Sequence, residues 1–503
     1  ADAPAIPWLG SSVFYQIFPD RFENGDPGND PQAEVLPYRN WHRKTFPWGQ
    51  PAPREPGLLP FYGGDLEGIR QKLDYLGRLG VNALYLNPIF TGYTNHRYDV
   101  ADYEHVDPVL GGDAALEALS AALRAHGMRY ILDIVPNHCG IGHPWFQAAQ
   151  ADPNSPEREY FFFGEKPGEY ASWLGFGSLP KLNYASQRLR DLMYRGEDGI
   201  MRRWLRPPWN ASGWRVDVGN MLGRLDAQQL DKEIIPEIRR AVKETKPEAY
   251  LVAENFFEAA SQLQGDGWDG VMNYSGFTDP LLHWLRPYQQ DAVGWKGKLG
   301  GSESWPTDLV LRSWQDHLAA VPWTIALQQL NSVDSHDTAR ILSEMGGNKR
   351  LSKLAAAVQF CFPGVPCVYY GDEIGLTDQE GFGSRACMNW DESAWDMELF
   401  GFYQKLIALR KSSRALAEGA FQILFGDDDT LIFQRVLGKE RVLVCANRSA
   451  EAAPARELAL PQAGFAAEER FRGVLSGGQA RAQNGVLRLP VMEQGAEIWV
   501  REG

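Results

Sequence analysis

The chain has 503 residues, of which 44% are hydrophobic, and a formal net charge of −14. This length suits one large domain with accessory parts, and the composition is ample for a packed core. No basic stripe is found, so nucleic acid and anionic membranes are not expected as partners. No apolar run reaches the roughly 18 residues of a membrane-spanning helix, so we expect no membrane span.

The five cysteines are scattered along the chain and form no cluster with metal-ligand spacing. We therefore expect free, buried thiols, which fit a reducing compartment and also occur in secreted enzymes. The first residues, "ADAPAIPW", are no signal peptide, although they fit a mature end from which a signal was removed. The compartment is left open at this point, with a secreted or periplasmic location slightly favoured over the cytoplasm.

Short apolar runs alternate with amphipathic stretches such as 66–80 and 113–127. Repeated strand-then-helix units predict a parallel sheet, and eight of them predict an α/β fold of the (β/α)₈ TIM-barrel type. The eight runs cover residues 13–18, 83–88, 130–138, 213–218, 250–255, 270–274, 327–337 and 365–373.

The spacing of these runs predicts four segments. Residues 1–138 and 206–413 would form the two parts of the barrel. The long, mostly loop-like stretch 139–205 lies between the third and fourth strands and is predicted to be an inserted subdomain. From about residue 414 short alternating runs joined by turns predict a C-terminal antiparallel β-sandwich over 414–503.

A charged pair interrupts the apolar run "GWRVDVGNM" (213–221). Side chains alternate between the two faces of a strand, so Arg215 and Asp217 would point the same way. Burying both is costly unless they are paired, and a structural ion pair is the simplest explanation. Other predicted strands also end in polar side chains, namely Asn137, His138, Glu254, His336 and Asp337. Because catalytic residues of such barrels lie at these strand ends, the acids predict the paired carboxyl groups of glycoside hydrolysis.

Four of these stretches together resemble a known family. "DIVPNH", "GWRVDVGN", "LVAENF" and "NSVDSHD" are similar, in this order, to the four conserved regions of the α-amylase superfamily, glycoside hydrolase family 13. "SLPKLNY" (178–184) resembles a fifth region found in its neopullulanase, cyclomaltodextrinase and maltogenic amylase group. "WLGFGSLPKLNY" and "YRGEDGIMRRWLRPPWNASGWRVDV" look most similar to maltodextrin glucosidases.

The resemblance implies a role for each acid. Asp217 would be the nucleophile, Glu254 the general acid and then the base, and Asp337 the group that holds two sugar hydroxyls. A guanidinium beside Asp217 should lower its pKa, whereas neighbouring carboxylates should raise the pKa of Glu254. A retaining mechanism would place the Asp217 and Glu254 carboxyl groups about 5–5.5 Å apart.

The resemblance also implies five substrate contacts. Arg215 would orient Asp217, Tyr98 would stack beneath the sugar ring, and the two histidines would bind its hydroxyls. Asn220 would line the leaving-group side. The five residues are Tyr98, His138, Arg215, Asn220 and His336.

Two stretches predict a structural calcium site. "FENGDPGND" (22–30) and "YGGDLEG" (62–68) are rich in oxygen donors, and the neopullulanase group carries the same pattern at this place. Calcium takes six to eight oxygens, although Asn, Asp and Gly also dominate ordinary turns. The candidate ligands are Asn24, Asp26, Asn29, Asp30, Gly63 and Asp65.

The resemblance has one departure that affects assembly. That group carries an N-terminal β-domain that supports dimers, whereas here the first barrel strand begins near Val13. We therefore expect a monomer with a more open cleft.

The predicted activity is retaining cleavage of α-1,4 bonds in maltooligosaccharides and starch. Cyclodextrin or pullulan hydrolysis and 4-α-glucanotransfer are the alternatives within the family. An inactive carbohydrate-binding scaffold is a remote alternative, which the presence of all three acids disfavours.

Overall fold

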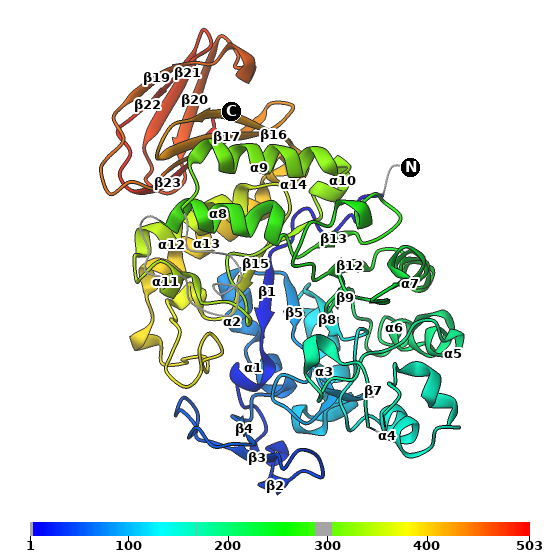
Figure 1. The fold of residues 1–503 in the computed structure, drawn as a ribbon. Coiled ribbons are helices and arrows are strands. Elements are labelled where there is room, and N and C mark those ends of the chain that lie inside the picture. The colour runs from blue at the N-terminus through cyan, green and yellow to red at the C-terminus, as the bar shows by residue number, and fades with distance from the viewer. Residues whose placement is uncertain (1–3, 167, 287–303, 503) are drawn as a thin grey trace.

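The computed structural model describes residues 4–166, 168–286 and 304–502 of the chain. Its largest part is a barrel, and a β-domain formed by the C-terminal residues packs at one end of it (Figure 1). Among the described residues, no helix combines the length and apolar character needed to cross a membrane.

The eight predicted strands form one parallel sheet, in the order β13-β12-β9-β8-β5-β1-β15-β14. A parallel bridge between Met272 and Leu330 joins the two outer strands, so the sheet closes on itself. The prediction of a TIM barrel is therefore confirmed. The strands are β1 (Phe14–Ile17), β5 (Ala83–Leu86), β8 (Arg129–Ile134), β9 (Gly213–Val216), β12 (Tyr250–Ala253), β13 (Gly270–Val271), β14 (Leu330–Asn331) and β15 (Val365–Tyr369).

Helices cover the outside of the barrel, as expected for strands that read as continuous apolar runs. The predicted helical stretch 66–80 divides into two helices at Lys72, and the stretch 113–127 forms a single helix. The helices of this layer are α1 (Leu66–Gln71), α2 (Leu73–Leu79), α3 (Gly112–Ala125), α7 (Asp231–Thr245), α8 (Asp279–Leu285), α9 (Thr307–Ala320), α10 (Trp323–Ala326), α11 (Ile341–Glu344), α12 (Lys349–Cys361), α13 (Met397–Ser412) and α14 (Arg414–Glu418).

Strand β9 shows how the alternating sequence orients the site. Trp214 points outward, where its indole Nε1 donates to the carbonyl of Met201 at 3.0 Å. Arg215, the next residue, is fully buried and contacts Asp133 of the neighbouring strand β8. Asp217 follows on the same face as Arg215 and pairs with it. The period of two therefore separates a packing face from a charged interior.

Two small sheets decorate the barrel between its first and third strands. One is a three-stranded sheet of β2 (Glu34–Val35), β3 (His42–Thr45) and β4 (Leu58–Phe61). It lies at the end of the barrel opposite the C-terminal domain in Figure 1. The other is a hairpin of β6 (Phe90–Gly92) and β7 (Val100–Val106).

The stretch 139–205 has two structural parts. Its first part is mostly irregular and is tied to the barrel by an antiparallel bridge between His138 and Lys181. Its last part forms helical turns, and the Arg190 guanidinium pairs there with Glu233 of α7. This last part therefore belongs to the helical layer around the barrel. The α-helices of the whole stretch 139–205 are α4 (Pro144–Ala151) in its first part and α5 (Gln187–Arg190) and α6 (Ile200–Arg203) in its last part.

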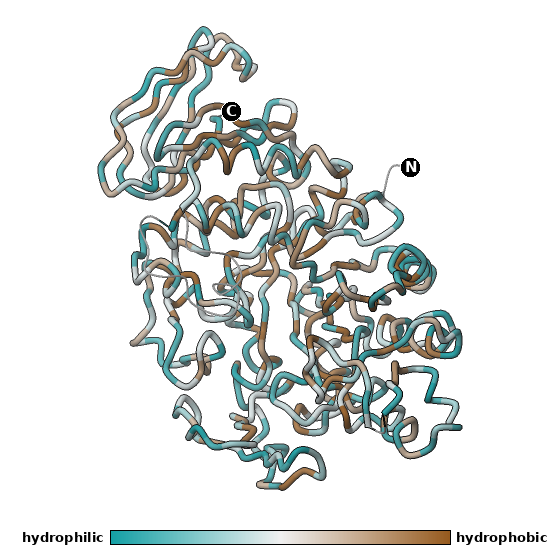
Figure 2. Tube along the Cα trace, in the orientation of Figure 1, coloured by the Kyte–Doolittle hydropathy of each residue, from teal (hydrophilic) through white to brown (hydrophobic). Residues whose placement is uncertain are grey.

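The C-terminal strands form one continuous antiparallel sheet that curls around an apolar core of its own. This agrees with the predicted terminal β-domain. Apolar stretches run through both the barrel strands and this sheet in Figure 2. The strands are β16 (Ala420–Gly426), β17 (Thr430–Leu437), β18 (Glu440–Asn447), β19 (Arg456–Ala459), β20 (Glu468–Gly473), β21 (Gln479–Gln483), β22 (Val486–Leu489) and β23 (Gly495–Arg501).

The five cysteines are all free and buried, as predicted. Cys361 lies at the end of α12, where its carbonyl accepts a hydrogen bond from Arg435 of the C-terminal sheet at 3.1 Å. Burial raises the pKa of its thiol to about 12, so this cysteine stays protonated and inert.

Candidate active site

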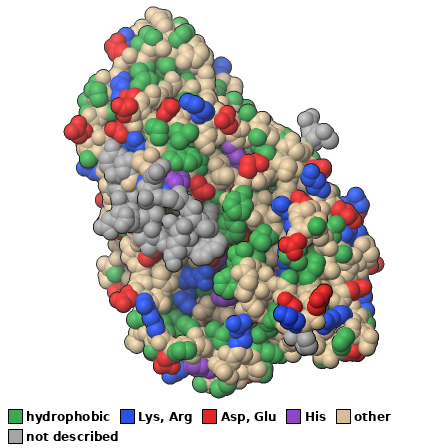
Figure 3. Space-filling view, in the orientation of Figure 1, with side chains coloured by type: hydrophobic (Ala, Val, Ile, Leu, Met, Phe, Trp, Pro, Cys, Tyr) green, Lys and Arg blue, Asp and Glu red, His purple; other side chains and the backbone are tan. Residues whose placement is uncertain are grey.

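A cavity of about 660 Å³ receives all three predicted acids, Asp217, Glu254 and Asp337. Each acid follows the carboxyl end of a barrel strand, which is where this fold places its functional groups. Aromatic side chains contribute much of the remaining wall. The face of the molecule seen in Figure 3 is hollowed near its centre, and hydrophobic side chains lie beside the hollow.

One buried guanidinium holds the acids of three adjacent strands together. Arg215 Nη1 lies 2.7 Å from Asp217 Oδ1 and 3.0 Å from Asp133 Oδ1, and its Nη2 lies 2.9 Å from Glu254 Oε1. The other Glu254 oxygen accepts a hydrogen bond from the backbone N–H of Val218 at 3.0 Å. Val218 has a φ of 49°, which is strained for a β-branched residue. The backbone thus turns sharply after Asp217 and fixes Glu254 as it does so.

The expectation that Asp217 has a lowered pKa is wrong. Burial raises the pKa of Asp217 well above its usual range; Arg215 opposes this, and Glu254 and Asp133 add to it. Burial likewise raises the pKa of Asp133 to about 6. Three carboxyl groups therefore share a single cation, and the charges of Glu254 and Asp133 both disfavour the ionised form of Asp217.

Asp337 behaves in the opposite way. Burial works to raise its pKa, but His336, Arg385 and Arg215 outweigh burial and lower the pKa to about 2. Arg385 makes the direct contacts, because it donates to Asp337 Oδ1 at 2.9 Å and to the carbonyl of His336 at 2.8 Å. Asp337 is therefore a fixed carboxylate that can accept hydrogen bonds from a ligand.

Tyr98 and His336 form a stacked pair in the cavity wall, with ring centroids 5.6 Å apart. Gln16 Nε2 donates to His336 Nδ1 at 2.9 Å, which leaves the proton on His336 Nε2. The Tyr98 hydroxyl, 2.7 Å from that nitrogen, donates in turn to Asp133 Oδ2 at 2.9 Å. Burial lowers the pKa of His336 to about 3, so its imidazole is neutral.

His138 presents a free N–H through a chain of contacts that starts at Lys181. The Lys181 ammonium, which can only donate, lies against Asn137 Oδ1. The Asn137 amide nitrogen therefore donates to His138 Nδ1, at 3.1 Å. This leaves the proton on Nε2, which is buried and has no partner among the described residues. Because His138 lines the cavity and burial lowers its pKa to about 3, it is a neutral donor there.

Like Arg215, Asn220 is a predicted contact that does not line this cavity. It lines a neighbouring cavity of about 420 Å³ instead, together with Asn255, the residue that follows Glu254. The other predicted contacts lie where they were expected: Tyr98, His138 and His336 line the cavity of the acids, and Arg215 lies directly behind them.

Several residues of the site were not predicted. Trp41 and Leu59 reach the cavity from the small sheet of β2, β3 and β4, Trp173 reaches it from the inserted stretch, and Arg385 comes from the segment after β15. Trp173 stacks on His138 with ring centroids 5.6 Å apart. Asp133, which contacts Arg215, was not predicted either. Its place in the sequence could have indicated it, because Asp133 has the same position in β8 as Arg215 has in the neighbouring strand β9.

The predicted calcium loop brings its residues together. Asn24 Nδ2 donates to Asp30 Oδ1 at 2.9 Å, and a side chain on Gly63, with its φ of 80°, would lie 2.2 Å from that oxygen. The amide oxygens of Asn24 and Asn29 are buried and find no hydrogen-bond partner in the part of the chain that the structure describes, so they could serve as metal ligands. Burial raises the pKa of Asp30, which fits a carboxylate that lacks a nearby cation.

Asp65 and Asp26 have other tasks in this loop. Asp65 accepts hydrogen bonds from the backbone of Gly25, Asp26 and Gly68 and from the Asn29 amide, so it caps α1 and fixes the loop. Asp26 is exposed and accepts from the N–H of Gly28. Among the described residues, no three His, Cys, Asp or Glu side chains form a metal site. The oxygens that fit a cation are therefore mainly amide and backbone oxygens.

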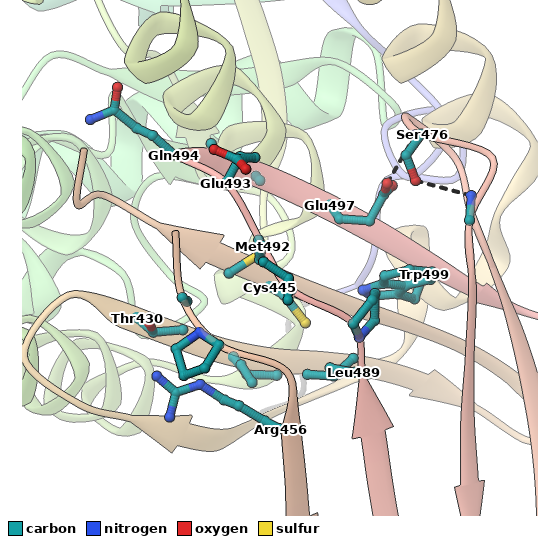
Figure 4. A pocket seen from close by; sticks show the side chains of 18 residues that line it. Thr430, Cys445, Arg456, Ser476, Leu489, Met492, Glu493, Gln494, Glu497 and Trp499 are labelled. Atoms are coloured by element: carbon teal, nitrogen blue, oxygen red, sulfur yellow. Dashed lines mark hydrogen bonds between the residues drawn. The ribbon is translucent and has the colours of Figure 1, made fainter. Parts of the chain in front are cut away.

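A further cavity, of about 290 Å³, lies in the C-terminal domain (Figure 4). Its Glu497 accepts hydrogen bonds from the backbone N–H groups of Leu475 and Ser476, each at 2.9 Å. Trp499 and Cys445 lie beside it in the core of the sheet. Because Glu497 is held by the backbone, this cavity does not offer the arrangement of acids found in the barrel.

Comparisons with known proteins agree with this geometry. Residues 16–395 match the α-amylase catalytic domain, and residues 419–499 match an α-amylase C-terminal domain. A cyclomaltodextrinase from a Bacillus species is 35% identical over 450 residues, which cover 88% of this chain and 73% of that protein.

Two solved structures are similar over almost the whole chain. A protein from Thermus thermophilus is 33% identical with a TM-score of 0.85, over 99% of this chain and 100% of that one. The cyclic α-maltosyl-(1→6)-maltose hydrolase from Arthrobacter globiformis is 31% identical with a TM-score of 0.79, and the coverage is again 99% and 100%. With its acids gathered in one barrel cavity, the chain belongs to the α-amylase family of glycoside hydrolases, in the group of cyclomaltodextrinases, maltogenic amylases and neopullulanases.

Proposed function

We propose that the enzyme hydrolyses α-1,4-glucosidic bonds of maltooligosaccharides and starch with retention of configuration. The observation that carries this proposal is the single cavity that receives Asp217, Glu254 and Asp337. Arg215 contacts Asp217 through Nη1 and Glu254 through Nη2, which supports a short separation between the two carboxyl groups. Close carboxyl groups are typical of retaining enzymes, because inverting enzymes need room for a water between them.

The reaction takes two displacement steps. In the first, Asp217 attacks the anomeric carbon, the bond to the leaving-group oxygen breaks, and Glu254 gives that oxygen its proton. In the second, water attacks the same carbon, its proton goes to Glu254, and the bond to Asp217 breaks. Arg215 Nη2, which lies 2.9 Å from Glu254 Oε1, and the N–H of Val218 hold this acid in place beside the nucleophile.

The remaining groups of the cavity suit a neutral sugar. His138 and His336 are neutral, so neither brings in a charge, and the His138 Nε2–H, which has no partner among the described residues, can donate to a sugar hydroxyl. Asp337, fixed by Arg385, accepts hydrogen bonds from hydroxyls on the same ring. Tyr98 and Trp173 supply flat faces for the apolar side of the ring.

A second candidate substrate is a cyclodextrin. The identity to a cyclomaltodextrinase supports it, since that relative matches most of this chain. A cyclic substrate has no chain end, so it also needs a cleft that accepts an internal bond.

We further propose that a structural calcium ion binds to the loop around Asp30. Its ligands would be the side-chain oxygens of Asn24, Asn29 and Asp30 and the backbone carbonyl of Gly63. Calcium prefers such hard oxygen donors, and it would neutralise the partly buried carboxylate of Asp30.

A time course of the products from maltoheptaose tests the proposed function, with β-cyclodextrin as a parallel substrate and Asp217→Asn as the control. We expect hydrolysis by the wild type and products whose first-formed anomer is α. Glucose or maltose alone from the first minutes would indicate attack at a chain end, whereas mid-length products would indicate internal cleavage. A first-formed β-anomer, or equal activity in the Asp217→Asn variant, would contradict the proposal.

A further inference from the structure

Lys181 carries a buried positive charge that no carboxylate balances among the described residues. The residue is only 2% exposed, and its ammonium donates to two neutral oxygens, Asn137 Oδ1 and, at 3.0 Å, the carbonyl of Met221. Burying an ammonium group without a carboxylate partner costs free energy. Buried charges kept at such a cost are frequent at functional sites, so we asked what this lysine does for the neighbouring cavity.

The ammonium of Lys181 joins three segments of the chain. Lys181 lies in the inserted stretch, Asn137 follows β8, and Met221 lies in the turn that follows β9. The backbone N–H of Leu182 also donates to the carbonyl of Asn137 at 3.0 Å, so the inserted stretch is fixed against the end of β8. The charged end of one side chain therefore connects the inserted stretch to the ends of two neighbouring barrel strands.

The charge of Lys181 decides which nitrogen of His138 carries the proton. An ammonium can only donate, so Asn137 must turn its oxygen toward Lys181 and its amide nitrogen toward His138 Nδ1, 3.1 Å away. A neutral amine has a lone pair and can also accept. Asn137 is then free to turn around, so that its oxygen accepts a hydrogen bond from Nδ1–H and the proton is missing from Nε2.

Lys181 loses its charge at only mildly alkaline pH. Burial lowers the pKa of its ammonium to about 8, and the charge of Arg224, which lies beyond Met221, acts in the same direction. Among the described residues no carboxylate raises this pKa again. The other titratable group beside Lys181 is His138, which is neutral because burial lowers its own pKa to about 3. The lysine is therefore charged at neutral pH and loses its proton as the pH rises through about 8.

We propose that Lys181 is a positioning residue whose positive charge keeps His138 in the form that donates a hydrogen bond to the substrate. The inference rests on the proposed function, in which the Nε2–H of His138 binds a sugar hydroxyl. While Lys181 is charged, Asn137 keeps that N–H directed into the cavity of the acids. Once Lys181 is neutral, the donor is no longer fixed, and the enzyme loses substrate binding at alkaline pH independently of Glu254.

The kinetic test uses α-maltosyl fluoride, because fluoride leaves without a general acid and the protonation of Glu254 does not limit the rate. For the wild type we expect kcat/KM to fall about tenfold around pH 8, the effect of one lost hydrogen bond of about 1.4 kcal/mol. Lys181→Met has no group that titrates there. Its kcat/KM should already be about tenfold lower at neutral pH and should show no further fall around pH 8.

Nitrogen NMR of enzyme with isotope-labelled histidine locates the proton without any substrate, and His138→Gln identifies the signals of His138. In the wild type at neutral pH we expect the proton on Nε2. In Lys181→Met, and in the wild type well above pH 8, we expect a mixture of the two neutral forms. Lys166→Met is the matched control, since Lys166 is the other lysine of the stretch 139–205 and is exposed. It should change neither the NMR signals nor the pH profile.

Lys181→Gln carries the test if Lys181→Met is not recovered folded, because an amide does not titrate and can turn either its oxygen or its nitrogen toward Asn137. It should remove the fall around pH 8 as well. An unchanged proton position on His138, or an unchanged pH profile in the Lys181 variants, with the wild type active on the fluoride, would overturn this inference alone. A wild type that does not cleave the fluoride would overturn the proposed function and this inference with it.

Discussion

The described part of the barrel contains two clusters, and each gathers three carboxyl groups around a buried arginine of its own. In one, Arg215 holds Asp133, Asp217 and Glu254. In the other, Arg340 contacts Asp372 at 3.0 Å, Asp372 is hydrogen-bonded to Asp334, and Glu373 follows in the chain. Burial raises the pKa of Asp334 to about 6 and that of Asp372 well above its usual range, as it does for Asp133 and Asp217.

The two clusters differ in what their acids face. Asp217 and Glu254 line the 660 Å³ cavity, whereas Asp334, Asp372 and Glu373 are not part of its lining. Glu373 instead accepts a hydrogen bond from the Tyr15 hydroxyl at 2.6 Å and another from the N–H of Gly371 at 2.9 Å. A buried carboxyl with a shifted pKa is therefore no evidence of catalysis by itself. Access to a cavity distinguishes the two clusters.

A substitution in the cluster around Arg215 should reduce the activity more than any other change considered below. Replacing Glu254 by Gln removes the general acid, and kcat on maltoheptaose should fall about 10²–10⁴-fold. Because the amide keeps the shape of the side chain, the melting temperature should change little. Steady-state kinetics and thermal unfolding measure the two quantities. An active Glu254→Gln enzyme would place the acid elsewhere.

The second effect concerns stability rather than rate. Arg340→Met leaves the buried carboxyl groups of its cluster without their cation, so the free energy of unfolding should fall by about 3–5 kcal/mol. Denaturant unfolding measures this loss. The kcat of the folded fraction should fall far less than in Glu254→Gln, and an equal fall would show that the second cluster also takes part in catalysis.

The proposed calcium loop is a third oxygen-rich group, and among the described residues no cationic side chain pairs with its Asp30. Chelation of calcium should lower the melting temperature of the wild type, since an ion at 100 times its Kd adds about 2.7 kcal/mol of stability. Gly63→Ala should cost more than about 1 kcal/mol, because Gly63 has a positive φ and its new methyl group would meet Asp30. Calorimetry with and without a chelator checks both.

In the Gly63→Ala variant the effect of the chelator should disappear. Gly112→Ala is the matched control, since Gly112 also has a positive φ but open space around it. A wild type whose unfolding ignores the chelator would contradict the calcium proposal.

The smallest effect is a shift along the pH axis. Asp133 raises the pKa of Asp217, so Asp133→Asn should lower that pKa. The nucleophile would then stay ionised at lower pH, and the acid limb of the kcat/KM profile should move to lower pH. Profiles measured with α-maltosyl fluoride check the direction. A limb that stays in place or moves to higher pH would show that Asp217 does not set it.

Much of the barrel could be predicted because each strand appears in the sequence as a short, local apolar run. The runs 83–88 and 365–373, for example, contain β5 and β15. The alternation in β9 also gave the inward direction of Arg215 and Asp217. The predicted acids, Tyr98, His138 and His336 lie together because their strands end at one edge of the barrel.

The rest of the site depends on the paths of long connections. Trp41, Trp173 and Arg385 reach the cavity from segments whose course no local pattern sets. Asn220 lies beyond the sharp turn at Val218 and so lines the neighbouring cavity. The expectation of a lowered pKa for Asp217 took only Arg215 into account, whereas the fold buries that acid beside two further carboxyl groups. The monomeric state and the compartment stay predictions.

In the proposed mechanism Asp217 forms the bond to the sugar, and the acids around Arg340 do not. This is tested most directly by incubating the Glu254→Gln variant with α-maltosyl fluoride, which needs no general acid to leave, and then locating the trapped adduct by peptide mass spectrometry. We expect one maltosyl unit on the peptide that contains Asp217. An adduct on Asp334, Asp372 or Glu373 would contradict it, as would turnover of the fluoride by this variant with inversion and without any adduct.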